Sequence, residues 1–199
     1  MQKKETYATT GTRSVVRFFG GWDYGADDVY RPDAVEIGYD QGVPMGGDLP
    51  SKPDVAKSPV VMVGALKDPW SGNLDRIQIV KGWVDGDGNL QERIYDVVCA
   101  DDREIGANGR CATPVGNTVD EANATYLNKI GDAEVRVVWR DPDFDPALRA
   151  VYYARVLEIP TPTWQAHDAK FFGVKMPEDV PLSHQERAYT SPIWYTPES

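Results

Sequence analysis

The sequence predicts an all-β fold, a predominantly antiparallel β-sandwich with long irregular loops and one or two short helices. The chain has 199 residues, of which 18 are Gly and 15 are Pro, and these residues divide it into short segments. The segments are rich in Val, Ile, Tyr, Phe and Trp, which favour strands. Several alternate apolar and polar residues, as strands do when a sheet buries one face. Because no long linker divides the chain, we expect a single domain over residues 1–199.

Seven segments show the strand pattern clearly, and an eighth shows it weakly. In the segment 75–84, Ile77 and Ile79 lie on one side while Arg76 and Gln78 lie on the other. The segment 150–158 is apolar on both faces except at Arg155, which indicates a central strand. We expect strands at 14–19, 59–66, 75–84, 91–100, 134–140, 150–158 and 193–196, and a weaker strand at 125–130.

Turn and helix signals complete the expected secondary structure. The sequence Asp-Gly-Asp-Gly-Asn at 85–89 joins two alternating segments and tolerates positive φ, so it predicts a hairpin. A short helix is expected at 32–39, with Pro32 in its first turn, and a single helical turn at 120–126. The stretches 20–57 and 161–183 are long and irregular, and loops of that length usually line or cover a surface.

Composition limits the classes of function. Asp and Glu number 31 against 21 Lys and Arg, a net charge of −10, and no basic cluster is present, so we expect neither a nucleic acid nor an anionic membrane as partner. No apolar run is long enough for a transmembrane helix, and the N-terminus lacks the apolar stretch of a signal peptide. With two histidines and two cysteines, a catalytic zinc centre or a histidine-based triad is not expected. Composition therefore favours a non-catalytic module.

Two acidic motifs resemble cation sites, and each has a plainer interpretation. A calcium loop that began at Asp85 would need its bidentate acid at Asp96, inside a predicted strand, so the hairpin is favoured. Asp141, Asp143 and Asp145 stand at alternate positions and are weak candidates for a hard cation. Asp-Pro steps also make turns between strands, and we favour the turn.

The two cysteines flank a polar loop. Cys99 and Cys111 are 12 positions apart, and a bridge across this loop would stabilise the fold by about 2–3 kcal/mol. The alternative is two free thiols, as in the cytosol. We favour the disulfide, because nothing else explains paired cysteines around this loop.

Aromatic residues and a glycine-rich segment leave a binding function open. The segment 42–49 is neither a phosphate-binding loop nor a dinucleotide fingerprint, so it is either a tight turn or a loop that faces a site. Of the six tryptophans, Trp22, Trp70 and Trp164 lie in predicted loops, where aromatic faces could stack on sugars. A free-standing ligand- or carbohydrate-binding sandwich is therefore an alternative function.

Six segments together resemble the bacterial family known as domain of unknown function 3604. They occur in the family's order and span nearly the whole chain. The segments are VRFFGGW at 16–22, GVPMGGDL at 42–49, LDRIQIVKGW at 74–83, DPDFDP at 141–146, YYARVLEIPTP at 152–162 and QERAYTSPIWYTP at 185–197.

The resemblance implies a hydrolase context. Family members look about three times longer and related to metallohydrolases of the polymerase-and-histidinol-phosphatase (PHP) type, whose N-terminal barrel carries His and Asp metal ligands. By this resemblance the chain corresponds to the C-terminal third of such a protein, with the divalent metal in the barrel and no cofactor here. The resemblance also implies an exported protein, periplasmic or secreted, which suits a Cys99–Cys111 bridge.

We therefore expect a non-catalytic β domain that braces the barrel and shapes the entrance to its site. The expected partners are the barrel and, through loops rich in large apolar residues, a second copy of the chain. A hydrolase site within this domain is the weakest alternative. Arg187 is a candidate to meet an anionic substrate and Asp48 to orient a ligand. The candidates for facing the site or an interface are Met45, Gly46, Gly47, Asp48, Gln185 and Arg187.

Overall fold

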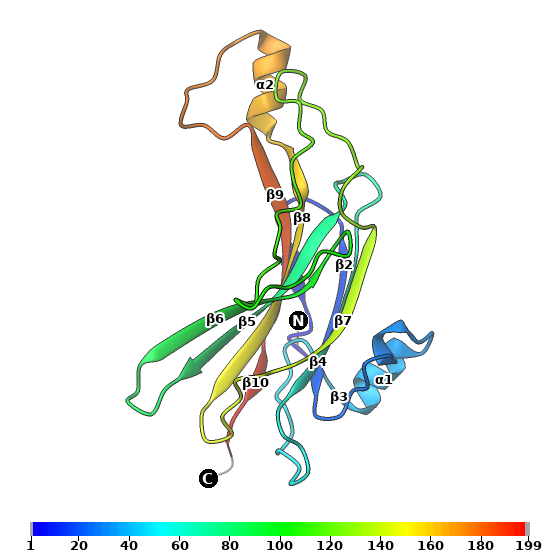
Figure 1. The fold of residues 1–199 in the computed structure, drawn as a ribbon, viewed down its shortest axis with the longest axis vertical. Helices are drawn as coiled ribbons and strands as arrows, with labels where there is room; N and C mark the ends of the chain where they lie inside the picture. The colour runs from blue at the N-terminus through cyan, green and yellow to red at the C-terminus, as the bar shows by residue number, and fades with distance from the viewer. Residues whose placement is uncertain (1, 198–199) are drawn as a thin grey trace.

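The computed structural model describes residues 2–197 and shows two antiparallel β-sheets that pack face to face (Figure 1). The larger sheet has the strand order β1-β9-β8-β5-β6, with β10 also paired to β8. The smaller sheet has the order β3-β2-β4-β7. The larger sheet contains β1 (Tyr7–Thr9), β5 (Leu74–Val84), β6 (Leu90–Cys99), β8 (Ala150–Pro162), β9 (Ser183–Thr190) and β10 (Ile193–Tyr195). The smaller contains β2 (Val15–Gly21), β3 (Gly42–Pro44), β4 (Val60–Leu66) and β7 (Glu134–Arg140). The predicted all-β, antiparallel sandwich is thus confirmed.

The main hydrophobic core lies between the two sheets. Phe18 and Val63 of the smaller sheet meet Ile77, Tyr152 and Val156 of the larger one, and all five side chains are buried. These positions follow the alternation of the sequence, because every second side chain of a strand points to the same face. The inner face of the larger sheet is therefore committed to the core, and its outer face is left for other contacts.

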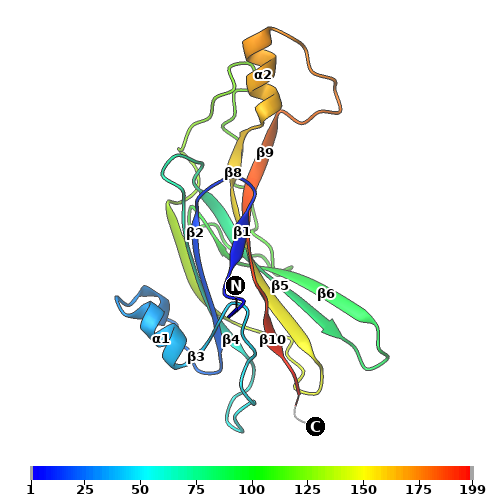
Figure 2. The ribbon, with the colours of Figure 1, turned by 180° about the vertical axis from the view of Figure 1, so that it is seen from behind.

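A second apolar cluster covers the outer face of the smaller sheet. Here α1 (Ala34–Asp40) and the short 3-10 helix Asp28–Tyr30 lie against β2 and β4 (Figures 1 and 2). Ile37 packs with Phe19, and a Cβ on Gly38 would lie 2.6 Å from the Phe19 ring, so only glycine fits there. The helix predicted at 32–39 is therefore present, but it begins at Ala34 and ends at Asp40, so Pro32 lies before its first turn.

The hairpin predicted at 85–89 joins β5 and β6. The Asp85 N–H donates to the Asn89 carbonyl (3.0 Å), and Gly88 has a φ of 85°. The Asp85 carboxylate accepts the backbone N–H groups of Asp87 (3.1 Å) and Asn89 (2.8 Å), and these bonds lower its pKa. The carboxylate that would bind the ion in a calcium loop thus accepts hydrogen bonds from the backbone of its own turn.

All seven clear strand predictions are confirmed, but the structure corrects three other predictions. The segment 125–130 is not a strand, since only Thr125 forms a bridge, with Asp120. Residues 121–124 form a turn rather than a helical turn. The stretch 161–183, predicted to be irregular, contains the end of β8 and the helix α2 (Trp164–Phe172). Strands β1, β3 and β9 were also not predicted.

The helix α2 lies at the far end of β8 and β9, away from the core (Figures 1 and 2). Its large side chains are exposed, among them Trp164, Phe171 and Phe172. An apolar stripe facing a core is the sequence signal for a helix, and this helix lacks one. Neither α-helix in the described range 2–197 is long and apolar enough to cross a bilayer.

Candidate functional site

A polar groove of about 780 Å³ lies against the outer face of the larger sheet. Its floor comes from β5, β6, β8 and β9, and its wall from the loop that follows β6. The register places Gln78 of β5 between Asp96 of β6 and Arg155 of β8, all on the face opposite Ile77 and Ile79. The charged and amide side chains that line the groove are Asp75, Arg76, Gln78, Asp96, Arg103, Arg110, Arg155 and Gln185.

Two irregularities in the strands lie at or beside the carboxylates of the groove. The register of β5 against β8 shifts between Leu74 and Arg76, which leaves Asp75 without a partner on β8. The register of β5 against β6 shifts beside Asp96, which leaves Val97 without a partner on β5. Such bulges bend a strand and redirect its side chains, and they are common next to functional sites.

Asp75 is the most deeply buried charge of the groove. Its carboxylate is fully buried and accepts hydrogen bonds from Arg76, from Arg103 Nη2 (2.6 Å) and from Gln185 Nε2 (2.8 Å). Arg103 also donates to the carbonyl oxygens of Ala100 (2.8 Å) and residue 113 (2.9 Å). One buried aspartate therefore ties β5, β9 and the loop after β6 together.

Asp96 organises the other side of the groove. Its carboxylate accepts hydrogen bonds from Gln78 Nε2 (2.6 Å), from the Cys111 N–H (2.9 Å) and from Arg110 Nη1 (3.3 Å). Arg76 Nε lies 3.7 Å from the same carboxylate. The side-chain amide oxygen of Gln78 (Oε1) in turn accepts a hydrogen bond from Arg155 Nε (2.7 Å). A continuous chain of hydrogen bonds thus links Arg155 to Arg110.

Arg155 is the one groove arginine without a carboxylate partner. Among residues 2–197, no Asp or Glu oxygen lies within 4.0 Å of its guanidinium group, and its neighbours Gln78 and Tyr189 are neutral. Tyr189 lies opposite Arg155 on β9, and Arg187 Nη1 lies 3.4 Å from its hydroxyl. Arg187 and Arg155 together lower the pKa of the Tyr189 phenol, because both stabilise its anion.

The groove carries excess positive charge although the whole chain has a net charge of −10. Four arginines line it against two aspartates, an excess of two positive charges. Both carboxylates are buried, whereas the side chains of Arg76 and Arg110 are 23% and 41% exposed. The groove therefore presents guanidinium groups to solvent.

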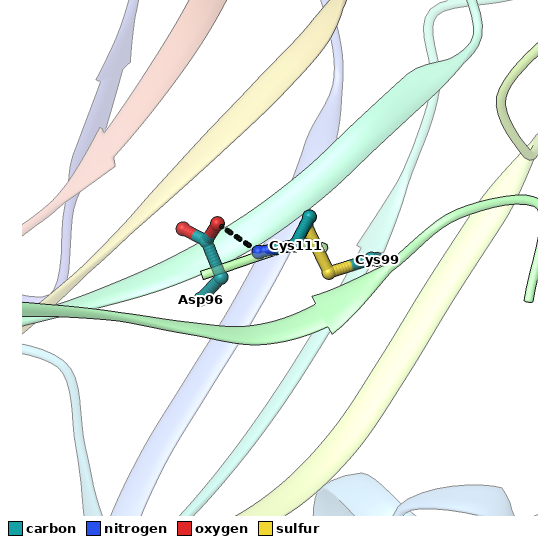
Figure 3. A group of neighbouring side chains, drawn as sticks. All are labelled: Asp96, Cys99 and Cys111. Carbon is teal, nitrogen blue, oxygen red and sulfur yellow. Dashed lines mark hydrogen bonds between the residues drawn. A yellow bond between two sulfur atoms is a disulfide. The ribbon is translucent and has the colours of Figure 1, made fainter. Parts of the chain in front are cut away.

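The predicted disulfide is confirmed, and it borders the groove. Cys99 ends β6, and its sulfur is bonded to that of Cys111, with the two Cα atoms 6.0 Å apart. Figure 3 shows the Asp96 carboxylate directed at the Cys111 backbone nitrogen, beside the bridge. Within the described residues, Asp96, Cys99 and Cys111 form a group at metal-ligand distance, but bonded sulfurs are not thiolate ligands. The bridge instead holds Arg110 at the groove.

A family model described as "Protein of unknown function (DUF3604)" matches residues 1–197. The chain belongs to the DUF3604 family. No curated protein and no solved structure matches it. The groove thus lies within a β-sandwich of this DUF3604 chain, and its chemistry has to be inferred from its own residues.

The structure brings one of the sequence-predicted site residues of this DUF3604 chain into the groove and another beside it. Gln185 lines the groove and donates to Asp75 and to the Glu158 carbonyl (both 2.8 Å). Arg187 lies two positions further along β9, is exposed, and contacts Tyr189.

The other four candidates lie in a separate turn after β3 and do not line the groove. Met45 is buried in the main core, and Asp48 bridges to Trp194. Gly46 has a φ of 87° and donates to the carbonyl of residue 192 (3.0 Å), and a Cβ there would lie 2.2 Å from a backbone oxygen. Gly47 donates to the carbonyl of residue 44 (3.0 Å), which closes the turn.

The three aspartates after β7 are occupied by protein donors. Asp141 pairs with Lys81 Nζ (2.6 Å) and accepts a hydrogen bond from the Tyr152 hydroxyl (2.7 Å). Burial, and then the charge of Asp141, raise the pKa of that phenol. Asp143 pairs with Arg93 (2.6 Å), and Asp145 accepts a backbone N–H two residues ahead (2.9 Å). Such contacts are those of turns between strands, the interpretation that the sequence favoured.

Most groove residues were not predicted as site residues. The available signal was charge inside strands: Arg155 interrupts an otherwise apolar segment, and Asp75 precedes an alternating one. Arg103 and Arg110 lie in the polar loop between the cysteines, where nothing in the local sequence indicates a site.

Proposed function

We propose that this chain is a non-catalytic β domain of a metal-dependent, phosphoesterase-like hydrolase, and that it braces a catalytic barrel and shapes the entrance to its site. The observation that carries the proposal is the groove, which offers guanidinium groups held by buried carboxylates. Neither His167 nor His184 lines it, so the groove is suited to binding rather than to nucleophilic or metal-assisted chemistry. The six resembling segments support membership of the DUF3604 family, and the relation of that family to PHP-type hydrolases is part of the proposal.

Exposed aromatic residues near the groove support docking of another domain. Phe171 is 82% exposed, and Trp164 and Phe172 are also exposed, all on α2. Groups of exposed large apolar residues usually mark interaction surfaces. Pro160, which lines the groove, lies only four positions before Trp164. A barrel bound at α2 would therefore stand at one end of the groove, where an accessory domain could shape an entrance.

The disulfide supports an exported protein. Disulfides persist in the periplasm and outside the cell and are rare in the cytosol of most organisms. Cys99 and Cys111 are bonded, and free cysteines are not found among the described residues. We therefore propose a periplasmic or secreted location.

The test is association with a catalytic barrel. The chain is co-expressed with the N-terminal part of a longer DUF3604 protein, and the complex is measured by light scattering after size exclusion. We expect a one-to-one complex that the double variant Phe171→Ser/Phe172→Ser weakens. The matched control is Leu90→Ser, which changes an equally exposed side chain at the β5–β6 hairpin. We expect this control to leave the complex intact.

Two results would overturn the proposal. One is a chain that remains monomeric in the presence of the barrel. The other is hydrolysis of a phosphoester by the chain alone, together with stoichiometric zinc, manganese or iron in elemental analysis. Binding of a carbohydrate by the monomer would instead favour the free-standing module.

A further inference from the structure

We propose that the groove binds an organic ligand through an oxyanion group, a phosphate ester, sulfate ester or carboxylate, held by the guanidinium groups of Arg155 and Arg110. The inference deepens the proposed function, since it names what the same groove would bind. It rests on that function only in assuming that the ligand is related to the substrate of the hydrolase. The binding itself is a property of this chain.

Arg155 supplies an unneutralised cation. It is half-buried in the middle of the sheet. Its Nε–H donates to the neutral side-chain amide oxygen of Gln78 at 2.7 Å. A partly buried charge without a counter-ion is costly, so such a charge is expected to gain an anionic partner. The planar guanidinium group matches the two oxygens of a carboxylate, phosphate or sulfate.

Arg110 supplies the second cation from the loop that forms the wall of the groove. Only one nitrogen of its guanidinium group is engaged within residues 2–197, by Asp96 at a long 3.3 Å. With its side chain 41% exposed, the remaining N–H groups face the groove or solvent. Arg103, by contrast, donates hydrogen bonds to Asp75 and to the carbonyl groups of Ala100 and residue 113. It therefore stabilises the loop, and we do not propose it as a ligand contact.

Both cations are held in place before any ligand arrives. Gln78 is buried and orients Arg155, while Asp96 orients Gln78 and Arg110 through bonds of 2.6 and 3.3 Å. The Cys99–Cys111 bridge holds the chain next to Arg110, and the Cys111 N–H donates to Asp96. Pre-positioned donors lower the cost of ordering on binding, which favours a specific anion site.

The size of the groove favours an organic ligand over a free inorganic ion. Its volume of about 780 Å³ falls within the range of small-molecule sites, about 300–1,000 Å³. Thr113 and Asn117 line the part contributed by the loop and offer neutral hydrogen-bonding groups for the rest of the ligand.

Tyr189 provides a reporter within the protein. Its hydroxyl contacts Arg187 at 3.4 Å and also Arg155, and these two cations lower its pKa. An oxyanion bound at Arg155 would offset part of this positive charge. Binding should therefore raise the pKa of Tyr189 towards the ordinary value.

The experiment is calorimetric titration of the full chain at low salt with four probes: inorganic phosphate, inorganic sulfate, citrate and glycerol phosphate. Comparing phosphate and sulfate with citrate separates a tetrahedral oxyanion from a carboxylate, and glycerol phosphate tests the preference for an organic ester. We expect millimolar or tighter binding of at least one probe, weakened by added sodium chloride.

Arg155→Gln and Arg110→Gln should each weaken that binding about 10-fold or more, since each removes a charge-assisted hydrogen bond. Arg31→Gln is the matched control, because it changes an exposed arginine that pairs with Asp33 in the link between the 3-10 helix and α1, away from the groove. We expect less than about a 2-fold change for this control, because distant surface charges are screened. An ultraviolet titration of wild-type tyrosines, repeated with Tyr189→Phe, gives a second readout that needs no groove variant.

Absence of binding of all four probes, or equal binding by the two groove variants and the control, would overturn the inference. An unchanged Tyr189 titration at saturating probe would also overturn it. These results leave barrel association unaffected, so failure of the ligand inference is distinguishable from failure of the proposed function.

Discussion

Replacing Asp75 with Asn tests whether the groove is built around one buried charge. The substitution keeps the shape of the side chain but removes the charge that Arg76, Arg103 and Gln185 share. Arg103 Nη2 then faces an amide in a fully buried position. Removing one partner of a buried ion pair destabilises by about 3–5 kcal/mol, because the remaining charge is left uncompensated.

For Asp75→Asn we expect a destabilisation at the lower end of that range. Arg76 is 23% exposed and can turn to solvent, and Arg103 keeps three backbone carbonyl oxygens, those of residue 75 (2.6 Å), Ala100 and residue 113. We therefore expect a loss of about 3 kcal/mol in the free energy of unfolding. We also expect faster hydrogen exchange in the loop 100–117, because the substitution weakens the charged contact of Arg103 with β5 and leaves the carbonyl oxygen of residue 75 as its acceptor on that strand.

The assay is urea denaturation followed by tryptophan fluorescence, with the free energy extrapolated to water. The matched control is Asp87→Asn, which removes the same charge from an exposed hairpin turn and should change stability by less than about 0.5 kcal/mol. A loss below about 1 kcal/mol for Asp75→Asn is the size expected for a solvent-screened surface pair. That result would refute the reasoning that the groove depends on a buried charge.

Three further predictions concern the surrounding scaffold. The double variant Cys99→Ala/Cys111→Ala should lose about 3 kcal/mol of unfolding free energy in urea, the loop-entropy value for a separation of 12, and an unchanged midpoint would contradict this. Burial raises the pKa of Glu158 above its ordinary 4.5, so its folded state holds a proton that the unfolded state has released, and stability should fall as pH rises from 4.5 through the folded pKa. Glu158→Gln should abolish this fall, so the thermal midpoints of the variant and wild type should agree at pH 4, and the variant should have the higher midpoint at pH 7. The same difference between the two midpoints at both pH values would contradict this prediction. Gly46→Ala should cost more than about 1 kcal/mol in urea, whereas Gly88→Ala, at a similar positive φ but in open space, should cost clearly less.

Local sequence patterns predicted much of the fold. Strands such as β7 at 134–140 and β5 were predicted because the alternation of apolar and polar residues along one segment indicates which side chains are buried. Strand β9 was missed because its first five residues, 183–187, are all polar and resemble a loop. Gln185 and Arg187 lie on the outer face, and Glu186, on the opposite face, contacts Thr10. Helix α2 was missed because its aromatic residues remain exposed, which removes the periodic signal of a packed helix.

The sequence by itself determined the all-β class, the β5–β6 hairpin, the disulfide and the family, because each depends on residues that are close together or on motifs in a set order. Only the tertiary structure decided the groove. Asp75, Asp96, Arg110, Arg155 and Gln185 are scattered over more than half of the chain. They meet because antiparallel register sets β6, β5, β8 and β9 side by side and pairs Asp96 and Arg155 with Gln78. A bulge lies at Asp75, and a disulfide bridge holds the loop of Arg110 beside the sheet. Which distant side chains share a sheet face depends on strand pairing and bulge position, and no local pattern carries that information.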